Sequence, residues 1–221
     1  MSQSFTPSRR HFVLGSAAAA VAASLPRAAR AADPVRIGLV IPLTGPFAST
    51  GRQIEAAVRL YMQRNGDTVA GQKVELLVRD DTGLAPETTK RLSQELITRD
   101  KVSFLAGFGL TPLALATAPL ATEAKVPMIV MAAATSIIPS KSPFIVRSSF
   151  TLAQVTAPMA EWAAKNKIRK VVTLVTDYGP GIDAEKTFIK RFTEAGGTVS
   201  DSVRSPLRNP DYAPFLQRAK D

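Results

Sequence analysis

The sequence predicts an α/β fold in which parallel sheets are covered by helices and divided between two lobes. From Val35 onward, short runs rich in β-branched residues alternate with longer segments that carry apolar residues at helical spacing. The alternation pauses near residues 147–151 and then begins again. Because a parallel strand pair needs a crossover helix, this pattern indicates sheets with helices on both faces.

The first series of elements begins with a strand at residues 35–41, which becomes continuously apolar toward its end. A helix at about residues 52–64 follows, with Ile54 and Tyr61 on its apolar stripe, and Asn65-Gly66 ends it. Pro86 then opens a second helix, as a first-turn proline should. The remaining elements of this series are strands at 74–78, 102–106, 127–131 and 144–147, and a helix at 112–124.

The second series predicts a helix at 152–166, a strand at 170–176, a helix at 182–195, a strand near 198–204 and a final helix at 212–220. We therefore expect a first lobe at residues 33–148 and a second lobe at residues 149–221. Two strands cannot bury both faces of a helix-covered sheet. The second lobe is accordingly expected to be incomplete, truncated at its C-terminus, with the natural protein continuing further.

Residues 1–32 resemble a targeting segment. Arg9-Arg10 directly precede an apolar stretch at residues 12–25, which is too short to span a bilayer, and Pro26 ends it. The paired arginines are typical of a twin-arginine signal peptide, and Ala29-Arg30-Ala31 offers a cleavage site near Ala31. The alternative is a short N-terminal amphipathic or membrane helix. Export by this route predicts a periplasmic protein.

The composition argues against catalysis and against nucleic acid. The chain has no cysteine, and its one histidine, His11, lies in the expected signal, so thiol chemistry, a serine–histidine triad and metal ligation by these residues are not available. The four arginines of residues 1–32 account for part of the basic surplus, leaving 24 basic against 18 acidic residues. Since these do not form one block, we expect no nucleic-acid partner, no catalytic residue, no metal and no cofactor.

Two further interpretations concern single residues. Asp80-Asp81 are adjacent at a strand end, where successive side chains point to opposite faces, so turn or cap roles are favoured over an acid–base pair. Trp162 shares a helical stripe with Met159 and Ala163, which favours a place in the core.

Four loops that follow strands have the composition of a ligand site. In open α/β folds, ligands bind beyond the carboxyl ends of the strands, against helix N-termini. The loop at 107–112 begins Gly-x-Gly but lacks the third glycine of a dinucleotide site; instead Thr111 is expected to cap, and Pro112 to open, a helix. The loops lie at residues 44–51, 107–112, 132–136 and 177–181. Their shared edge predicts one ligand cleft.

At these residues the chain resembles the substrate-binding proteins of ABC transporters, of the branched-chain amino acid (Leu/Ile/Val-binding) family, which have the type I periplasmic binding fold. The resemblance runs from about Val35 to Asp221. Residues 37–46 match the family's opening strand and loop, Asp80-Asp81 its acidic pair, and residues 126–129 its fourth strand. The resemblance implies two lobes that close on a small solute.

The resemblance also implies which residues bind the solute. The loop at Gly109, Leu110 and Thr111 would supply hydroxyl and backbone donors to a carboxylate, while Ala133 and Thr135 would supply a carbonyl and a hydroxyl. Tyr178 matches the aromatic residue of the second lobe that covers the solute. Phe47 belongs to the first of the four loops and completes the expected set. Thr50 stands where amino acid binders often have tyrosine, and Gly109-Leu110 replace a serine-rich stretch, which leaves a less polar or roomier pocket.

The expected function is therefore extracytoplasmic binding of a small carboxylate-bearing solute, either an amino acid or an aromatic or aliphatic acid, and its delivery to the membrane permease of an ABC importer. The protein is expected to act as a monomer. The alternative is a ligand-sensing receptor or regulator domain of the same fold. An exported α/β enzyme would need chemistry without histidine or cysteine.

Overall fold

Two separate sheets, of six strands and of two, organise the part of the chain that this computed structural model describes, residues 33–208 and 210–220. All the described helices and strands belong to one compact unit, which begins at Pro34. The signal peptide expected at residues 1–32 lies outside the described residues. Within the described ranges, every helix is too short or too polar to cross a bilayer.

The larger sheet has the strand order β2-β3-β1-β4-β5-β6, and every pair is parallel except β2 with β3. The prediction of a parallel sheet covered by helices is confirmed. The antiparallel β2 was missed; it is joined to β3 by Ala70 and Gly71, both with positive φ, as in a tight hairpin turn. The strands are β1 (Val35–Ile41), β2 (Thr68–Val69), β3 (Gln72–Asp80), β4 (Phe104–Gly107), β5 (Met128–Val130) and β6 (Ile145–Arg147).

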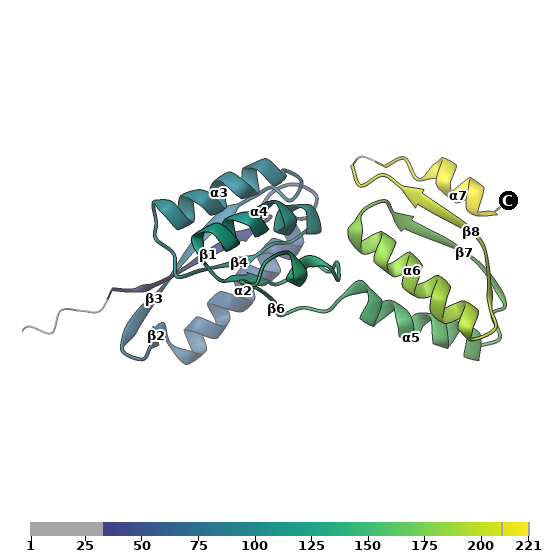
Figure 1. The fold of residues 1–221 in the computed structure, drawn as a ribbon, viewed down its shortest axis with the longest axis horizontal. Helices are drawn as coiled ribbons and strands as arrows, with labels where there is room; N and C mark the ends of the chain where they lie inside the picture. The colour runs from purple at the N-terminus through teal and green to yellow at the C-terminus, as the bar shows by residue number, and fades with distance from the viewer. Residues whose placement is uncertain (1–32, 209, 221) are drawn as a thin grey trace, which may run out of the picture. The chain divides into compact units, whose positions relative to one another are not determined.

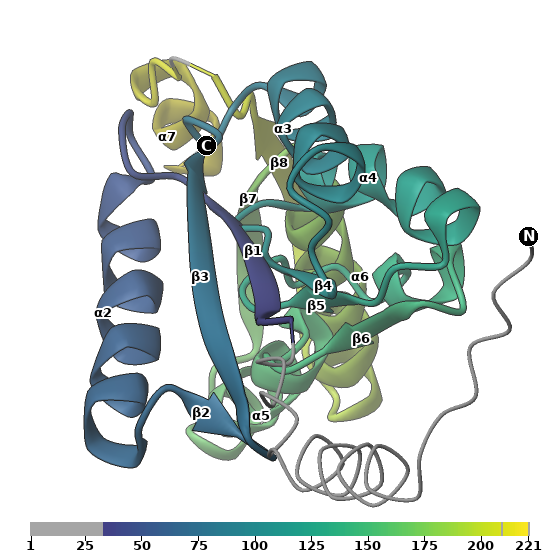
Figure 2. The ribbon, with the colours of Figure 1, turned by 90° about the vertical axis from the view of Figure 1, so that its left-hand side faces the viewer.

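Helices lie on both faces of this sheet. Figure 2 shows α2 running along one face beside β3, with α3 and α4 on the other side. The helices end close to the expected positions, although α2 begins four residues earlier than predicted. Their bounds are α2 (Ala48–Asn65), α3 (Pro86–Thr98) and α4 (Thr111–Ala124), and a 3-10 helix η1 spans Ile138–Lys141.

Two apolar clusters form the core around the larger sheet. One gathers Leu96, Leu105, Met128 and Phe108, among others, where α3 and α4 cover the strands. The other contains Leu39, Ile41 and Ala106, with residues of α2 and β3 packed against it. Leu39, Val40 and Ile41 are all fully buried, so β1 is a central strand buried on both faces, as its continuous apolar run predicts.

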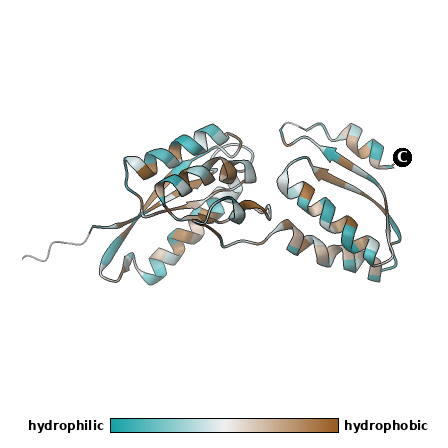
Figure 3. Ribbon diagram, viewed as in Figure 1, coloured by the Kyte–Doolittle hydropathy of each residue, from teal (hydrophilic) through white to brown (hydrophobic). Residues whose placement is uncertain are grey.

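The smaller sheet pairs β7 with β8 in parallel, with an irregularity between Val171 and Val172. In Figure 1, α5 and α6 lie on one side of these strands and α7 on the other. In Figure 3, β7 is mainly hydrophobic in colour and β8 mainly hydrophilic. The elements are α5 (Leu152–Lys165), β7 (Lys170–Thr176), α6 (Gly179–Glu194), β8 (Thr198–Ser205) and α7 (Ala213–Lys220).

The expectation that Trp162 lies in the core is wrong. Its side chain is 61% exposed and that of Met159 is 64% exposed, whereas Ala160 and Ala163 of the same helix are buried against Phe192. Helix α5 therefore turns its small residues, not its large ones, toward α6. Trp162 and Met159 instead border an apolar hollow of about 390 Å³ beside β7.

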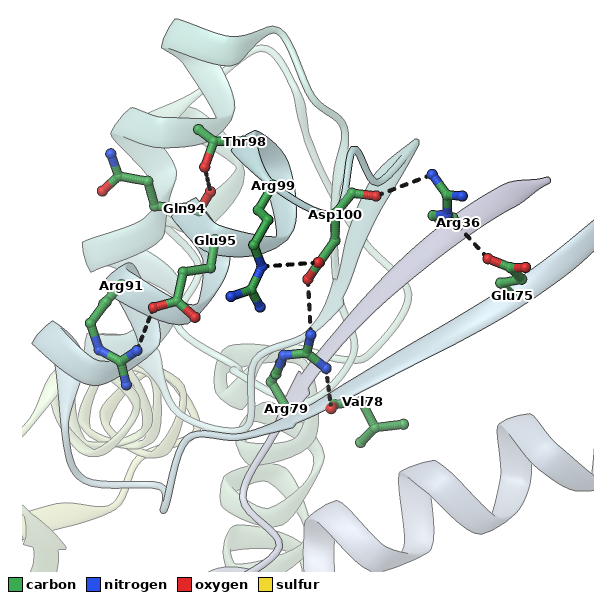
Figure 4. Close-up of polar contacts among 10 residues, drawn as sticks. All are labelled: Arg36, Glu75, Val78, Arg79, Arg91, Gln94, Glu95, Thr98, Arg99 and Asp100. Carbon is green, nitrogen blue, oxygen red and sulfur yellow. Dashed lines mark hydrogen bonds and ion pairs between the residues drawn. The ribbon is translucent and has the colours of Figure 1, made fainter. Parts of the chain in front are cut away.

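Several basic side chains around the larger sheet are paired with nearby carboxylates. Figure 4 shows Asp100, at the end of α3, accepting from Arg79 at 2.9 Å and from Arg99 at 3.3 Å. Arg36 on β1 pairs with Glu75 on β3 at 3.1 Å. Such partly exposed pairs stabilise the fold by roughly 0–1 kcal/mol each.

The acidic pair at the end of β3 has the turn role that the sequence favours, and its two members differ in environment. Asp80 accepts from the backbone N–H groups of Leu43 and Thr82 and from the Thr44 hydroxyl. Desolvation raises the pKa of Asp80, but the hydrogen bonds together outweigh it and hold that pKa below its usual value. Asp81 is fully buried and accepts from the Gly83 N–H, while its Oδ2 has no partner among the described residues.

Burial raises the pKa of Asp81 from 3.8 to about 6, against the hydrogen bond from Gly83 and with help from the charge of Asp80. Between about pH 4 and pH 6, the folded protein therefore keeps a proton that the unfolded chain has released. The free energy of unfolding should fall by up to about 3 kcal/mol as pH rises through this window. Asp81→Asn should remove this loss, because the amide is neutral and its oxygen can still accept from Gly83.

The measurement is urea unfolding of wild type and Asp81→Asn between pH 4 and pH 8. The variant should match wild type near pH 4 and exceed it above pH 6. Asp80→Asn is the matched control and should behave oppositely, since its lowered pKa stabilises the folded state above the unfolded value: it should be less stable than wild type at neutral pH and approach it in acid. A difference between Asp81→Asn and wild type that stays constant with pH would contradict the assignment.

Candidate functional site

The strand order places a crevice at the carboxyl ends of β1 and β4. The chain leaves β1 toward β3 on one side and returns to β4 on the other, so the loops after β1 and β4 diverge at this point. A cavity of about 730 Å³ lies here, lined by residues from the segments that follow β1, β4, β5, β6 and β7. The four loops that the sequence marks thus approach one hollow.

The turn after β4 is shaped by two unusual backbone positions. Gly107 has φ +111°, and a Cβ there would lie 2.2 Å from the Val40 carbonyl oxygen, so a side chain cannot be accommodated. Phe108 has φ 63°, which costs a bulky residue of order 1–3 kcal/mol, yet its side chain is fully buried in the core. The left-handed turn directs Phe108 inward, while the next residues, Gly109, Leu110 and Thr111, line the cavity.

Thr111 does not cap α4 as predicted. Leu110 occupies the N-cap position without a side-chain hydrogen bond, and Thr111 is already the first residue of the helix. Its hydroxyl lies 2.7 Å from the hydroxyl of Thr135, in the loop after β5, and both residues are buried. The tertiary partner across 24 residues explains why the hydroxyl does not turn back to its own helix.

The segment after β1 brings α2 to the cavity. A Cβ on Gly51 would lie 1.8 Å from the Pro42 carbonyl oxygen, so the first turn of α2 packs closely on the end of β1. Thr50 and Gln53 line the cavity from this helix. Phe47 lies elsewhere: its ring is beside Gly83, and it is not among the cavity-lining residues.

Tyr178 and Pro180, from the turn between β7 and α6, also line the cavity. Tyr178 is extended, with φ −157° at the N-cap of α6, and burial raises the pKa of its hydroxyl. At Gly179, a Cβ would lie 2.6 Å from the Thr135 hydroxyl oxygen. Glycine therefore allows the start of α6 to approach the loop after β5.

Polar contacts continue around that loop. The backbone N–H and hydroxyl of Ser136 both donate to Asp183 of α6, at 2.8 and 2.6 Å. On β6, Arg147 donates from Nη2 to the Thr135 carbonyl oxygen at 2.5 Å. Ser149 lines the cavity, and its buried hydroxyl has no hydrogen-bond partner among the described residues.

The cavity wall is largely apolar. It includes Ile54, Leu110, Met131 and Phe150 together with backbone of the loop after β5, while its polar side chains are few. This is the composition of a site that encloses the body of a small molecule and orients it by a few hydrogen bonds.

The structure brings five of the seven predicted site residues to the cavity wall: Gly109, Leu110, Thr111, Ala133 and Tyr178. Thr135 is in contact with Thr111 behind the wall, and Phe47 lies apart. The sequence did not single out Gln53 or Phe150 as solute-binding residues, because nothing in their local pattern distinguishes them from other residues of a helix or a loop.

Comparison with known proteins gives consistent relatives. The family described as "Periplasmic binding protein" matches residues 34–221. A curated relative, Leu/Ile/Val-binding protein homolog 6 of Brucella abortus (strain 2308), is 44% identical over 198 residues, covering 90% of this chain and 51% of its own length.

Two solved structures are also similar. A solute binding protein of an ABC transporter from Rhodopseudomonas palustris BisB5, in complex with 3,4-dihydroxybenzoic acid, is 58% identical with a TM-score of 0.82, over 86% of this chain and 52% of that one. Its counterpart from Rhodopseudomonas palustris HaA2, in complex with p-hydroxybenzoic acid, is 46% identical with a TM-score of 0.83, over 85% and 51%.

The chain spans about half the length of these relatives. The family match nevertheless covers all the described helices and strands, and the Brucella relative is similar over most of the chain. The parallel sheet covered by helices agrees with the fold that the sequence resemblance implies. The chain therefore belongs to the periplasmic binding proteins, as a type I member of the branched-chain amino acid family of ABC-transporter solute-binding proteins.

Proposed function

We propose that this protein binds a benzoate-type aromatic carboxylate in the cavity at the carboxyl ends of β1 and β4, and delivers it to the permease of an ABC importer. The observation that carries the proposal is the 58% identity to a solute binding protein whose structure contains 3,4-dihydroxybenzoic acid. Relatives at 46% and 44% identity are in complex with p-hydroxybenzoic acid and 4-hydroxybenzoate. An aromatic acid is therefore favoured over the branched-chain amino acids of the family name.

The shape and lining of the cavity support a ring-bearing solute. Its volume of about 730 Å³ exceeds that of a single benzoate, so water or lobe closure must occupy the remainder. Tyr178 and Phe150 offer aromatic surface, and Ile54, Leu110 and Met131 offer aliphatic surface. Such walls favour an apolar ring over a strongly solvated zwitterion, because burial of unpaired charge is costly.

The carboxylate is assigned to the start of α4. At this helix start Pro112 has no N–H, and the N–H of Leu113 donates to the Leu110 carbonyl oxygen at 3.2 Å. The backbone donors for a carboxylate are therefore the N–H groups of Leu110 and Thr111, at the positive end of the helix dipole. The Thr111 hydroxyl, paired with Thr135, adds a donor at the same place. In this proposal Gly109 and Leu110 supply backbone, Ala133 supplies a carbonyl, and Tyr178 covers the ring; Phe47 would contact the solute only after movement of the loop after β1.

The wider organisation belongs to the same proposal. Residues 1–32 act as a twin-arginine signal that exports the protein to the periplasm, and lobes at residues 33–148 and 149–221 approach each other around the solute. The protein acts as a monomeric carrier and catalyses no reaction. Among the described residues, the contacts of Ser136 with Asp183 join the two lobes beside the cavity, as a closing site requires.

A thermal-shift panel tests the solute class. Benzoate, 4-hydroxybenzoate and 3,4-dihydroxybenzoate should each raise the Tm, while leucine and valine should not. A ligand at one thousand times its Kd adds about 4 kcal/mol to the free energy of unfolding, which is a shift of several degrees for a chain of this size. A shift with leucine alone would contradict the proposed solute class.

Tyr178 should contribute directly to affinity. Tyr178→Ala should weaken binding of 4-hydroxybenzoate by about 1–3 kcal/mol, or roughly 5- to 150-fold, because a buried aromatic contact is lost. Tyr178→Phe keeps the ring and should lose much less. Tyr212→Ala removes a tyrosine that is 50% exposed and does not line the cavity, and it should leave the Kd unchanged. Calorimetric titration gives all four constants, and equal affinities for wild type and Tyr178→Ala would remove Tyr178 from the site.

A further inference from the structure

A single peptide group beside the cavity is held at both of its ends by opposite charges. Arg147 donates from Nη2 to the carbonyl oxygen of Thr135 at 2.5 Å, and the N–H of Ser136 donates to Oδ2 of Asp183 at 2.8 Å. That carbonyl and that N–H belong to the same peptide bond. The Ser136 hydroxyl donates to the same carboxylate oxygen at 2.6 Å, which strengthens the hold on one end.

The geometry of a trans peptide makes this arrangement specific. The C=O and N–H of a planar peptide point in opposite directions, so a cation at the oxygen and an anion at the nitrogen fix the orientation of the plane. Both are charge-assisted hydrogen bonds, roughly twice as strong as neutral ones. A flipped peptide would direct its carbonyl toward Asp183 and its N–H toward Arg147, and both contacts would become repulsive.

The held peptide is next to the proposed carboxylate position. The Thr135 hydroxyl lies 2.7 Å from the Thr111 hydroxyl at the start of α4, and Ala133 and Ala134 line the cavity just before it. Release of the peptide between Thr135 and Ser136 would remove two of the hydrogen bonds that hold the loop after β5, and a shift of that loop would move the Thr135 hydroxyl away from Thr111. Neither Arg147 nor Asp183 is among the cavity-lining residues, so neither is placed to contact the solute directly.

Arg147 depends on its surroundings for charge compensation. Its Nε and Nη1 are buried and have no hydrogen-bond partner among the described residues. Burial lowers the pKa of Arg147, and the charge of Asp183 opposes that effect. Asp183 thus contributes twice, by accepting from Ser136 and by offsetting the charge of a guanidinium that is only partly hydrogen-bonded.

We propose that Arg147 and Asp183 are positioning residues that clamp the Thr135–Ser136 peptide group and thereby hold the Thr111–Thr135 hydroxyl pair in the orientation that binds the solute. Arg147 comes from β6 and Asp183 from α6, so the clamp is complete only while α6 lies against the loop after β5. It links the approach of the second lobe to the geometry of the first-lobe site. The affinity part of this inference rests on the proposed function.

The first test measures the Kd of 4-hydroxybenzoate by calorimetric titration of the mature protein and its variants. Asp183→Asn and Arg147→Met should each weaken binding by about 10- to 150-fold, as for the loss of a hydrogen bond to a charged group. The double variant should lose less than the product of the two, because either change alone releases the peptide. Arg147→Lys keeps a cationic donor and should recover part of the affinity. Glu194→Gln, at an exposed position of the same helix α6, is the matched control and should bind as wild type does.

The second test needs no solute. Amide hydrogen exchange resolved by NMR should show the Ser136 N–H protected in the wild-type chain and exchanging at least about tenfold faster in Asp183→Ala. Arg147→Met should also accelerate exchange at Ser136, although it does not contact that N–H. The Tm of each variant establishes that it is folded, and Ser136→Ala serves as a milder variant that removes only the hydroxyl contact.

The outcomes separate the two proposals. Wild type that binds none of the benzoates counts against the proposed function, while exchange at Ser136 still decides whether the clamp exists. Folded Asp183→Ala and Arg147→Met chains with wild-type exchange at Ser136 would overturn the clamp. So would multiplicative losses of affinity in the double variant, since independent contributions exclude action through one shared peptide.

Discussion

Parallel pairing of β1 with both β3 and β4 is the constraint on which the rest of the structure depends. Because β1 is buried on both faces, its neighbours must be joined to it by crossovers that cover those faces, and α2, α3 and α4 supply the cover. The same pairing aligns the carboxyl ends of the strands on one edge. It also sends the chain in opposite directions after β1 and β4. The strand order by itself therefore opens a crevice at that edge, whatever residues line it.

Close backbone approach then determines which residues can stand at that edge. Gly107 cannot carry a side chain beside the Val40 carbonyl oxygen. Phe108 has a left-handed backbone conformation, which places its ring in the core. The strain at Phe108 is offset by complete burial of a large aromatic side chain, which is worth roughly 1.5–3 kcal/mol. As a result, the residues at the start of α4, Leu110 and Thr111, line the cavity. Core packing and ligand geometry are therefore two consequences of the same turn.

The sequence predicts this much of the fold because alternation of strand and helix patterns is local information. Strand β7 agrees with its predicted bounds, and several other elements differ by only a residue or two at either end. The predicted environments of two single side chains, Trp162 and Thr111, were wrong. A helical stripe shows that Trp162 and Ala163 are neighbours, but it does not show which of them faces α6. Thr111 precedes a proline as an N-cap would, yet its hydroxyl bonds to Thr135, a partner that only the folded loop brings near.

The same reasoning explains why Arg147 and Asp183 were not foreseen. Neither has a motif, and each acts on backbone atoms of residues 12 or 47 positions away. Main-chain groups carry no sequence signature, so a contact that fixes a peptide plane is visible only in three dimensions. A binding site made largely of apolar walls has few polar groups with which to discriminate among solutes, and the orientation of each one matters correspondingly more. In such a site, residues that fix the backbone can influence specificity as much as residues that touch the solute.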